Sequence, residues 1–174
     1  GVALTVQSLE HGLRERGHSV DLIRPRQTGH SQPAPHESLV PGLSVPRYPG
    51  LRFGLPATRT LISLWNLHRP DAIYVATEGP LGWSALRAAR LLRIPAATGF
   101  HTRFDRYMRD YGVPFLQPLA LRWMRHFHNS ASATLVPTEA LRDELKSMGF
   151  RFPLRLPRAV DSAQFHPAHR DNPL

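Results

Sequence analysis

Residues 72–102 read AIYVATEGPLGWSALRAARLLRIPAATGFHT and decide the fold. The apolar run at 72–76 suits a buried parallel strand. The Gly-Pro pair at 79–80 permits a tight turn and a helix start, and apolar residues at helical spacing continue through 81–92. A second strand-like run follows at 96–100. Strand, helix and strand in this order predict an α/β domain with parallel strands.

The same alternation extends to both sides of this segment. We predict a helix over 2–16 that ends at Gly17, a strand at 19–23, a helix around 61–68, a helix from Pro118, a strand at 133–136, a helix capped by Thr138 and ended by Gly149, and a short strand around 154–156. Residues 25–46 are dense in Pro, Gly, Ser and His and predict a long surface loop. On the helix from Pro118 we expect Leu119, Trp123 and Phe127 to face inward. The pattern predicts a Rossmann-like fold with a mostly parallel sheet and helices on both faces.

Length and composition limit the class of protein. The 174 residues, 41% of them hydrophobic, suit one globular domain. The net charge of +9 favours anionic partners, although a solvated basic surface explains it equally well. The absence of cysteine excludes disulfides and a cysteine nucleophile. With no apolar run of about 20 residues and no signal-peptide pattern, the sequence predicts a cytoplasmic protein.

Ligands bind doubly wound sheets at the carboxyl ends of the strands, so residues that follow strands are candidates for binding. Glu78 follows the strand at 72–76, although an acidic side chain at a helix start also stabilises the helix dipole without any ligand. His101 follows the strand at 96–100 and can donate a hydrogen bond to a sugar hydroxyl or to a developing charge. Thr102 can orient a hydroxyl or a phosphate. A histidine in this place is otherwise an ordinary surface or core residue.

Two further places are candidates for anion binding, and one pair of histidines is not a metal candidate. Gly1 opens a helix whose free N–H groups can bind a diphosphate, though any helix start offers them. Tyr48 and Arg52 lie in a Pro- and Gly-containing loop and suit a phosphate-bearing polyol, with plain loop packing as the rival explanation. The i,i+2 spacing of His126 and His128 puts them on different helix faces, so we predict no metal site.

Five stretches, taken in order, resemble the family 4 retaining glycosyltransferases of GT-B fold, and especially their GDP-mannose-dependent α-mannosyltransferases and phosphatidylinositol mannosyltransferases. These stretches are GVALTV at 1–6, LRFG at 51–54, EGPLG at 78–82, GFHT at 99–102 and VDSAQFHP at 160–167. The resemblance covers essentially the whole chain. It implies that residues 1–158 form the acceptor-side Rossmann-like domain, the N-terminal half of the fold, and that 159–174 begin the linker to a second domain.

The resemblance also implies roles for single residues. Gly1 would face the donor diphosphate, His101 would contact the transferred sugar as the catalytic-site residue, and Thr102 would assist donor binding. Tyr48 and Arg52 would hold the acceptor, and the turn Glu78-Gly79-Pro80 would border it. The donor would be a GDP- or UDP-linked hexose, with no other cofactor, and the acceptor a lipid or glycan.

Several expectations follow from what the family has and this sequence lacks. A strand before Gly1 and a nucleotide-binding C-terminal domain are both missing, so we expect this chain alone to be inactive. Two alternatives stay open: a non-catalytic basic module that binds polyanions, and another GT-B enzyme such as a sugar-nucleotide epimerase. Nucleic acid is not expected as the partner, because aromatic and basic residues do not interleave. Arginine-bearing amphipathic segments at 52–69 and 122–128 also suggest peripheral contact with an anionic membrane, at the inner face of the plasma membrane, although solvated helix faces explain them equally well.

Overall fold

The computed structural model describes residues 2–27, 32–44, 52–101 and 117–157. In chain order its elements are α1 (Val2–Glu15), β1 (Leu22–Pro25), β2 (Glu37–Val40), β3 (Gly42–Ser44), β4 (Arg52–Gly54), α2 (Thr58–Leu67), β5 (Ile73–Val75), α3 (Pro80–Leu92), β6 (Ala96–Gly99), α5 (Gln117–His128), β7 (Ala133–Val136), α6 (Glu139–Ser147) and β8 (Pro153–Arg155).

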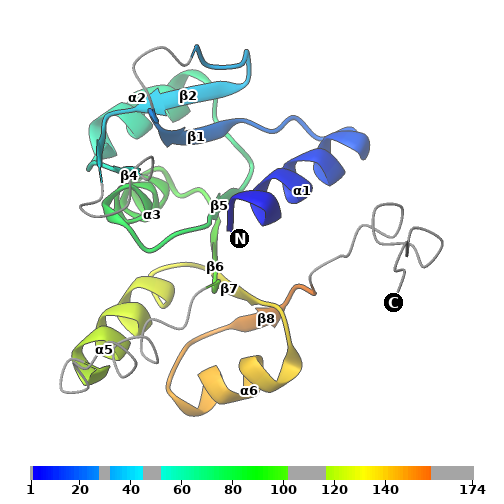
Figure 1. The fold of residues 1–174 in the computed structure, drawn as a ribbon, viewed down its shortest axis with the longest axis vertical. Coiled ribbons are helices and arrows are strands. Elements are labelled where there is room, and N and C mark those ends of the chain that lie inside the picture. Colours follow the sequence, from blue (N-terminus) through cyan, green and yellow to red (C-terminus); the bar gives the residue numbers. More distant parts are fainter. Residues whose placement is uncertain (1, 28–31, 45–51, 102–116, 158–174) are drawn as a thin grey trace, which may run out of the picture.

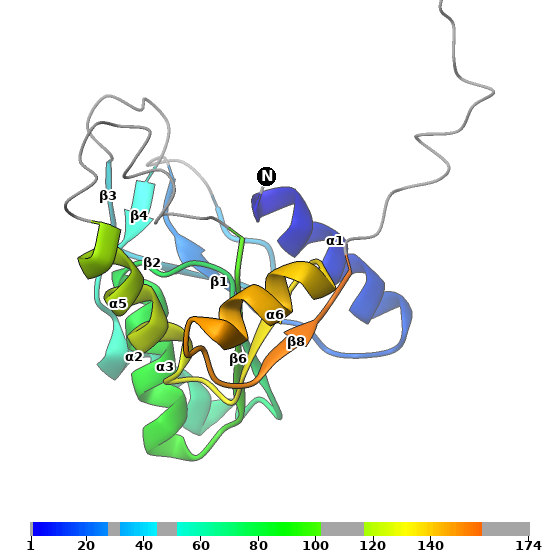
Figure 2. The same ribbon diagram turned by 90° about the horizontal axis from the view of Figure 1, so that it is seen from below.

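Most strand pairs are parallel. The main sheet has the order β5-β6-β7-β8, and every pair in it is parallel. β1 and β2 form a second parallel pair, while β3 and β4 pair antiparallel. Figures 1 and 2 place α1 on one side of strands β5 and β6, and α3 and α5 on the other. The predicted α/β fold with a mostly parallel sheet is therefore confirmed.

The predicted signals for helix ends are confirmed in the backbone. Gly17 and Gly149 have φ values of 83° and 84°, the left-handed conformation that glycine adopts without a steric penalty. The Thr138 side chain caps α6 by accepting a hydrogen bond from the backbone N–H of Leu141, at 3.2 Å. Pro80 is the first residue of α3. These local rules hold because each depends on neighbours in the chain and not on distant packing.

The prediction of a long loop over 25–46 is wrong, because β2 and β3 lie within it. The predicted strand at 19–23 is displaced, since pairing with β2 begins only at Leu22. Arg24 reaches across this pair and donates hydrogen bonds to both carboxylate oxygens of Glu37, at 3.0 and 2.7 Å. This bond lowers the pKa of Glu37 below its ordinary value. A cross-strand ion pair and the burial of Val40 outweigh the loop-like composition.

The predicted inward face of the helix from Pro118 is largely wrong. Phe127 is fully buried, but Leu119 is 65% exposed and Trp123 is 42% exposed. Met124 and His128 are the other buried residues of α5. The three apolar side chains were grouped at a spacing of four only, whereas the buried face follows the i, i+3, i+4 pattern and includes a histidine.

Two groups of buried side chains form the core. The first lies around α2, α3 and β5 and includes Leu61, Trp65, Val75, Leu86 and Phe127. The second lies around β6, β7, α5 and α6 and consists of Phe100, Met124, Val136, Leu145 and Phe150. Between α3 and α5, Trp83 packs against Trp123 and edge-on against Phe127, with ring centroids 6.4 and 5.2 Å apart.

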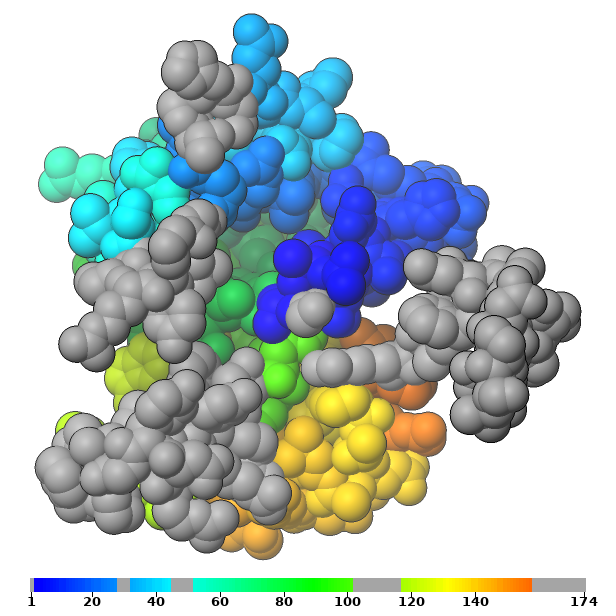
Figure 3. Space-filling model, viewed as in Figure 1, coloured from blue at the N-terminus to red at the C-terminus, as the bar shows by residue number. Residues whose placement is uncertain are grey.

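α1 differs from the other helices in burying no residue completely. It lies at the molecular surface, in dark blue in Figure 3. Its apolar stripe, formed by Val6, Leu9 and Leu13 at helical spacing, is only partly covered. Among the helices in the described part of the chain, none is both long and apolar enough to cross a bilayer.

Candidate functional site

The carboxyl ends of β5 and β6 bring two of the predicted site residues to one edge of the sheet. Glu78 follows β5 and His101 follows β6, and these strands are parallel neighbours. Figures 1 and 2 both show the beginning of α1 near this edge. The edge therefore combines an imidazole, a carboxyl group and two helix starts, those of α1 and α3.

The imidazole of His101 is held by a tyrosine from the neighbouring strand. The Tyr74 hydroxyl and Nε2 of His101 lie 2.7 Å apart, and their rings are nearly perpendicular, at 89°. His101 is partly exposed. A partly exposed imidazole that is fixed by a hydrogen bond suits the binding of a polar ligand.

The side chain of Glu78 turns toward the protein interior. It is 7% exposed, and Oε1 lies 3.3 Å from Nε2 of His128, which is completely buried. The other ring nitrogen of His128 lies 2.8 Å from Oγ1 of Thr98, and Thr98 in turn lies 3.3 Å from Oγ1 of Thr134. This chain of four polar side chains joins the β5–α3 turn to α5, β6 and β7. The carboxyl group of Glu78 therefore anchors the β5–α3 turn to the protein interior through His128.

The Glu-Gly-Pro turn is also fixed by close packing at the start of α3. A Cβ atom on Gly82 would collide with the backbone oxygen of Thr77, so only glycine lets the helix approach the end of β5 this closely. One on Gly54 would lie 2.8 Å from Leu81, which shows that β4 packs directly against the same helix start. Gly79 precedes Pro80 as the N-cap of α3 and has extended backbone.

Arg52 belongs to β4 and is therefore near the start of α3, but its guanidinium already has protein partners. Its two terminal nitrogens donate to the backbone oxygens of Gln27 at 3.0 Å and Gly42 at 2.7 Å. Its Nε is buried and has no hydrogen-bond partner among the described residues. Each terminal nitrogen carries a second N–H. The guanidinium is thus fixed in position while further donors remain.

Three predicted site residues, Gly1, Tyr48 and Thr102, lie outside the described residues, as does the segment 160–167. Sequence reasoning missed Tyr74 and Thr98, although a tyrosine inside an apolar strand next to a candidate histidine was a usable signal. It placed His126 and His128 on different helix faces, which is confirmed, since His128 is buried and His126 exposed. The partners of His128 could not be found from helical spacing alone.

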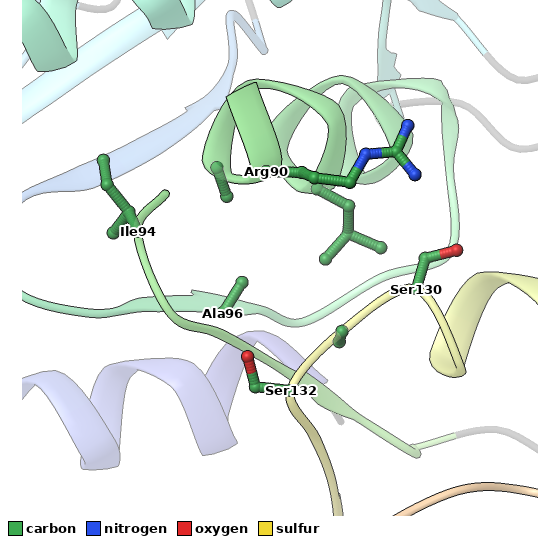
Figure 4. Close-up of a pocket in the computed structure, with 8 residues that line it drawn as sticks. Arg90, Ile94, Ala96, Ser130 and Ser132 are labelled. Carbon is green, nitrogen blue, oxygen red and sulfur yellow. The ribbon is translucent and has the colours of Figure 1, made fainter. Parts of the chain in front are cut away.

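A shallow hollow lies at the opposite edge of the sheet, at the amino ends of β6 and β7. Figure 4 shows its lining, to which Arg90, Ile94, Ala96, Ser130 and Ser132 contribute. Ala96 begins β6, and Ser132 directly precedes β7. The hollow is therefore separate from the edge that carries His101 and Glu78.

Comparison with known proteins agrees with this arrangement. The family described as Glycosyltransferase Family 4 matches residues 1–164. The chain belongs to glycosyltransferase family 4.

Three individual relatives are similar to the chain over most of its length. The chain is 32% identical to a GDP-mannose-dependent alpha-mannosyltransferase of Mycobacterium tuberculosis, over 97% of this chain and 46% of that protein. It is 31% identical to a protein of the same name from Mycolicibacterium smegmatis, over 100% of this chain and 48% of the relative. An alpha-monoglucosyldiacylglycerol synthase of Streptococcus pneumoniae is 22% identical over 95% of this chain and 38% of its own length. The chain spans less than half the length of these curated relatives, and it matches their N-terminal part.

Proposed function

We propose that this chain is the acceptor-side domain of a retaining glycosyltransferase that moves a hexose from a GDP- or UDP-linked sugar to a lipid or glycan acceptor. The observation that carries the proposal is the position of His101, partly exposed at the carboxyl end of β6 and bound to Tyr74. A sugar hydroxyl at this edge would meet an oriented imidazole and the adjoining starts of α1 and α3. Mannose is the sugar we expect first, because two relatives at 32% and 31% identity are named for GDP-mannose.

The proposal assigns the residues around this edge to two sides. His101, Gly1 and Thr102 would serve the donor, with His101 as the catalytic-site residue. Arg52, Tyr48 and the turn formed by Glu78, Gly79 and Pro80 would serve the acceptor. Arg52 supports this division for two reasons. Its strand, β4, packs against the start of α3, beside the turn assigned to the acceptor, and the guanidinium of Arg52 is fixed by two hydrogen bonds. Glu78 would border the acceptor mainly by holding the turn, since its carboxyl group is buried against His128.

In the proposed enzyme a second domain supplies the nucleotide pocket, so residues 1–158 alone would be inactive. Closure of the two domains would align donor and acceptor and exclude water from the reacting carbon. The proposed site needs no metal and no cofactor besides the sugar nucleotide. We propose that the enzyme acts in the cytoplasm and takes its sugar nucleotide from there.

The test is transfer activity of the full-length protein with a panel of GDP- and UDP-linked hexoses. Loss of one group that stabilises developing charge costs about 100-fold or more, so His101→Ala should lower kcat/KM by that amount. His68→Ala is the matched control, because His68 is an exposed histidine at the end of α2. Equal activity of the two variants would refute the assignment of His101. Binding to heparin or another polyanion, without transfer of any sugar, would favour the alternative of a binding module. Interconversion of free sugar nucleotides would favour an epimerase.

We also propose that α5 contacts an anionic membrane in the full-length enzyme. Its exposed face carries Leu119 and Trp123 beside Arg122, with Arg125 further round the helix, where it donates to the backbone oxygen of Met148. The helix contains no acidic residue. Such a face can insert apolar side chains while its cations meet lipid phosphates. The relative named for diacylglycerol glycosylation makes a lipid acceptor a reasonable expectation.

Liposome flotation tests this contact. Leu119→Ser with Trp123→Ser should lower binding to vesicles that contain anionic lipid, because it removes the apolar side chains that would insert. Leu91→Ser on α3 is the control, since Leu91 is also exposed, at 61%. No binding at low salt by the unmodified protein would refute the proposal.

A further inference from the structure

We propose that Tyr74 is a positioning residue that orients the His101 imidazole for its sugar ligand, and that Gly99 is the residue that makes this contact possible. This inference rests on the proposed function of His101. It assigns a role to two residues that sequence reasoning left without one. Tyr74 itself would not touch the substrate.

The strand register explains why these residues meet. β5 and β6 are parallel, with Tyr74 opposite Ala97 and Val75 opposite Thr98. Side chains alternate between the two faces of a strand, so positions 97, 99 and 101 lie on the face that Tyr74 shares. Thr98 points to the other face, where it meets His128 of α5. His101 is thus on the face of the sheet opposite to α5, the side on which α1 lies in Figures 1 and 2.

Gly99 supplies the space in which the two rings make contact. A Cβ atom built on Gly99 would collide with both the Tyr74 hydroxyl and Nε2 of His101. Gly99 has no positive φ, so its backbone conformation does not explain the glycine. The absence of a side chain is what the tyrosine–histidine pair requires, because any larger residue would push the hydroxyl and the imidazole apart.

The contact determines two properties of His101. The hydroxyl of Tyr74 lies 2.7 Å from Nε2, a distance typical of a good hydrogen bond, and it therefore restricts rotation of the ring. A neutral imidazole has one donor and one acceptor nitrogen, so a bond at Nε2 also biases which nitrogen carries the proton. Both properties matter for a group that has to meet a sugar hydroxyl in a defined direction.

Tyr74→Phe is the variant that tests this role, because it removes one oxygen atom and keeps the ring. A neutral hydrogen bond contributes about 0.5–1.5 kcal/mol, which corresponds to a factor of about 2 to 12. We therefore expect kcat/KM for sugar transfer by the full-length enzyme to fall about 3- to 10-fold. The ¹⁵N chemical shifts of the His101 ring, assigned by their absence in His101→Ala, should move toward the values of a mixed tautomer population. A purely structural role for Tyr74 would not change these shifts.

A double-mutant cycle separates failure of this inference from failure of the proposed function. If Tyr74 acts through His101, Tyr74→Phe should cause no further loss of kcat/KM in a His101→Ala background. Additive losses, or unchanged ring shifts in Tyr74→Phe, would overturn the inference. Unchanged activity of His101→Ala would instead overturn the proposed function, while the ring shifts would still report whether Tyr74 orients the histidine. Gly99→Ala provides a second variant, which should alter the same shifts by displacing the pair.

Discussion

The N-terminal region, α1 with β1 and β2, and the four-stranded region, β5 to β8 with its helices, are stabilised to different degrees. No residue of α1 is fully buried, and all four residues of β1 are only partly buried. In the four-stranded region, by contrast, Ala88, Met124 and Phe127 are completely buried, as are the hydroxyl-bearing Thr98 and Thr134. The second region holds most of the buried core, to which β2 adds Val40, whereas α1 leaves its apolar residues only partly covered.

The sheet pairing follows the same division. Among the described residues, β1 pairs only with β2, and β5 pairs only with β6. The two parallel sheets are therefore not joined to each other by strand pairing in this part of the chain. The family resemblance predicts one more strand before Gly1, and this stays a prediction. Within the described residues, the backbone groups on the outer edges of β1 and β5 therefore have no neighbouring strand to pair with.

The largest expected effect contrasts one core side chain with one from α1. Phe127→Ala should lower the free energy of unfolding by about 3–5 kcal/mol, because it removes a fully buried ring that contacts both tryptophans of α3 and α5. Leu4→Ala should cost less than about 0.5 kcal/mol, since Leu4 is 66% exposed and alanine favours the helix. Urea denaturation measures both values. Similar costs for the two variants would contradict the proposed difference between the regions.

A somewhat smaller effect is expected for the buried polar chain of the four-stranded region. His128→Leu removes the imidazole that lies between Glu78 and Thr98, and breaking such a buried pair costs about 3 kcal/mol. Adding Glu78→Gln should recover part of this loss, because the variant then buries no carboxyl group without its imidazole. His126→Leu is the control on the same helix and should be nearly neutral. Thermal and urea unfolding measure both losses of unfolding free energy. Equal losses for His126→Leu and His128→Leu would show that the buried contacts of His128 do not cause the effect.

The smallest effect concerns the ion pair of the N-terminal region. Bonding to Arg24 lowers the pKa of Glu37, so the pair stabilises the folded state above the ordinary glutamate pKa of about 4.3. This stabilisation is lost as the pH falls through the lower pKa of the folded state. Glu37→Gln should therefore cost about 0.2–1 kcal/mol at neutral pH, a value typical of accessible ion pairs, and almost nothing in strong acid. Unfolding curves that differ equally at both pH values would argue against this explanation.

Much of the four-stranded region could be predicted from the sequence, because its strands are continuous apolar runs and its helices carry caps and stops such as Thr138 and Gly149. The place of His101 after β6 followed from the same alternation. The contact with Tyr74 did not, since it depends on the register between two strands. β2 was missed because Glu37 and Val40 are stabilised by distant partners. The inward face of α5 was missed because a spacing of four alone leaves out Met124 and His128, which are buried.

The contact of Trp83 with Trp123 and Phe127 has a practical consequence for spectroscopy. Of the three tryptophans in the sequence, these two lie at the junction of α3 and α5, whereas Trp65 is buried in the core beside α2. Partly exposed indoles change their emission wavelength when water is displaced from them. The intrinsic fluorescence of the protein should therefore report, without any added dye, when lipid or another molecule settles on α5.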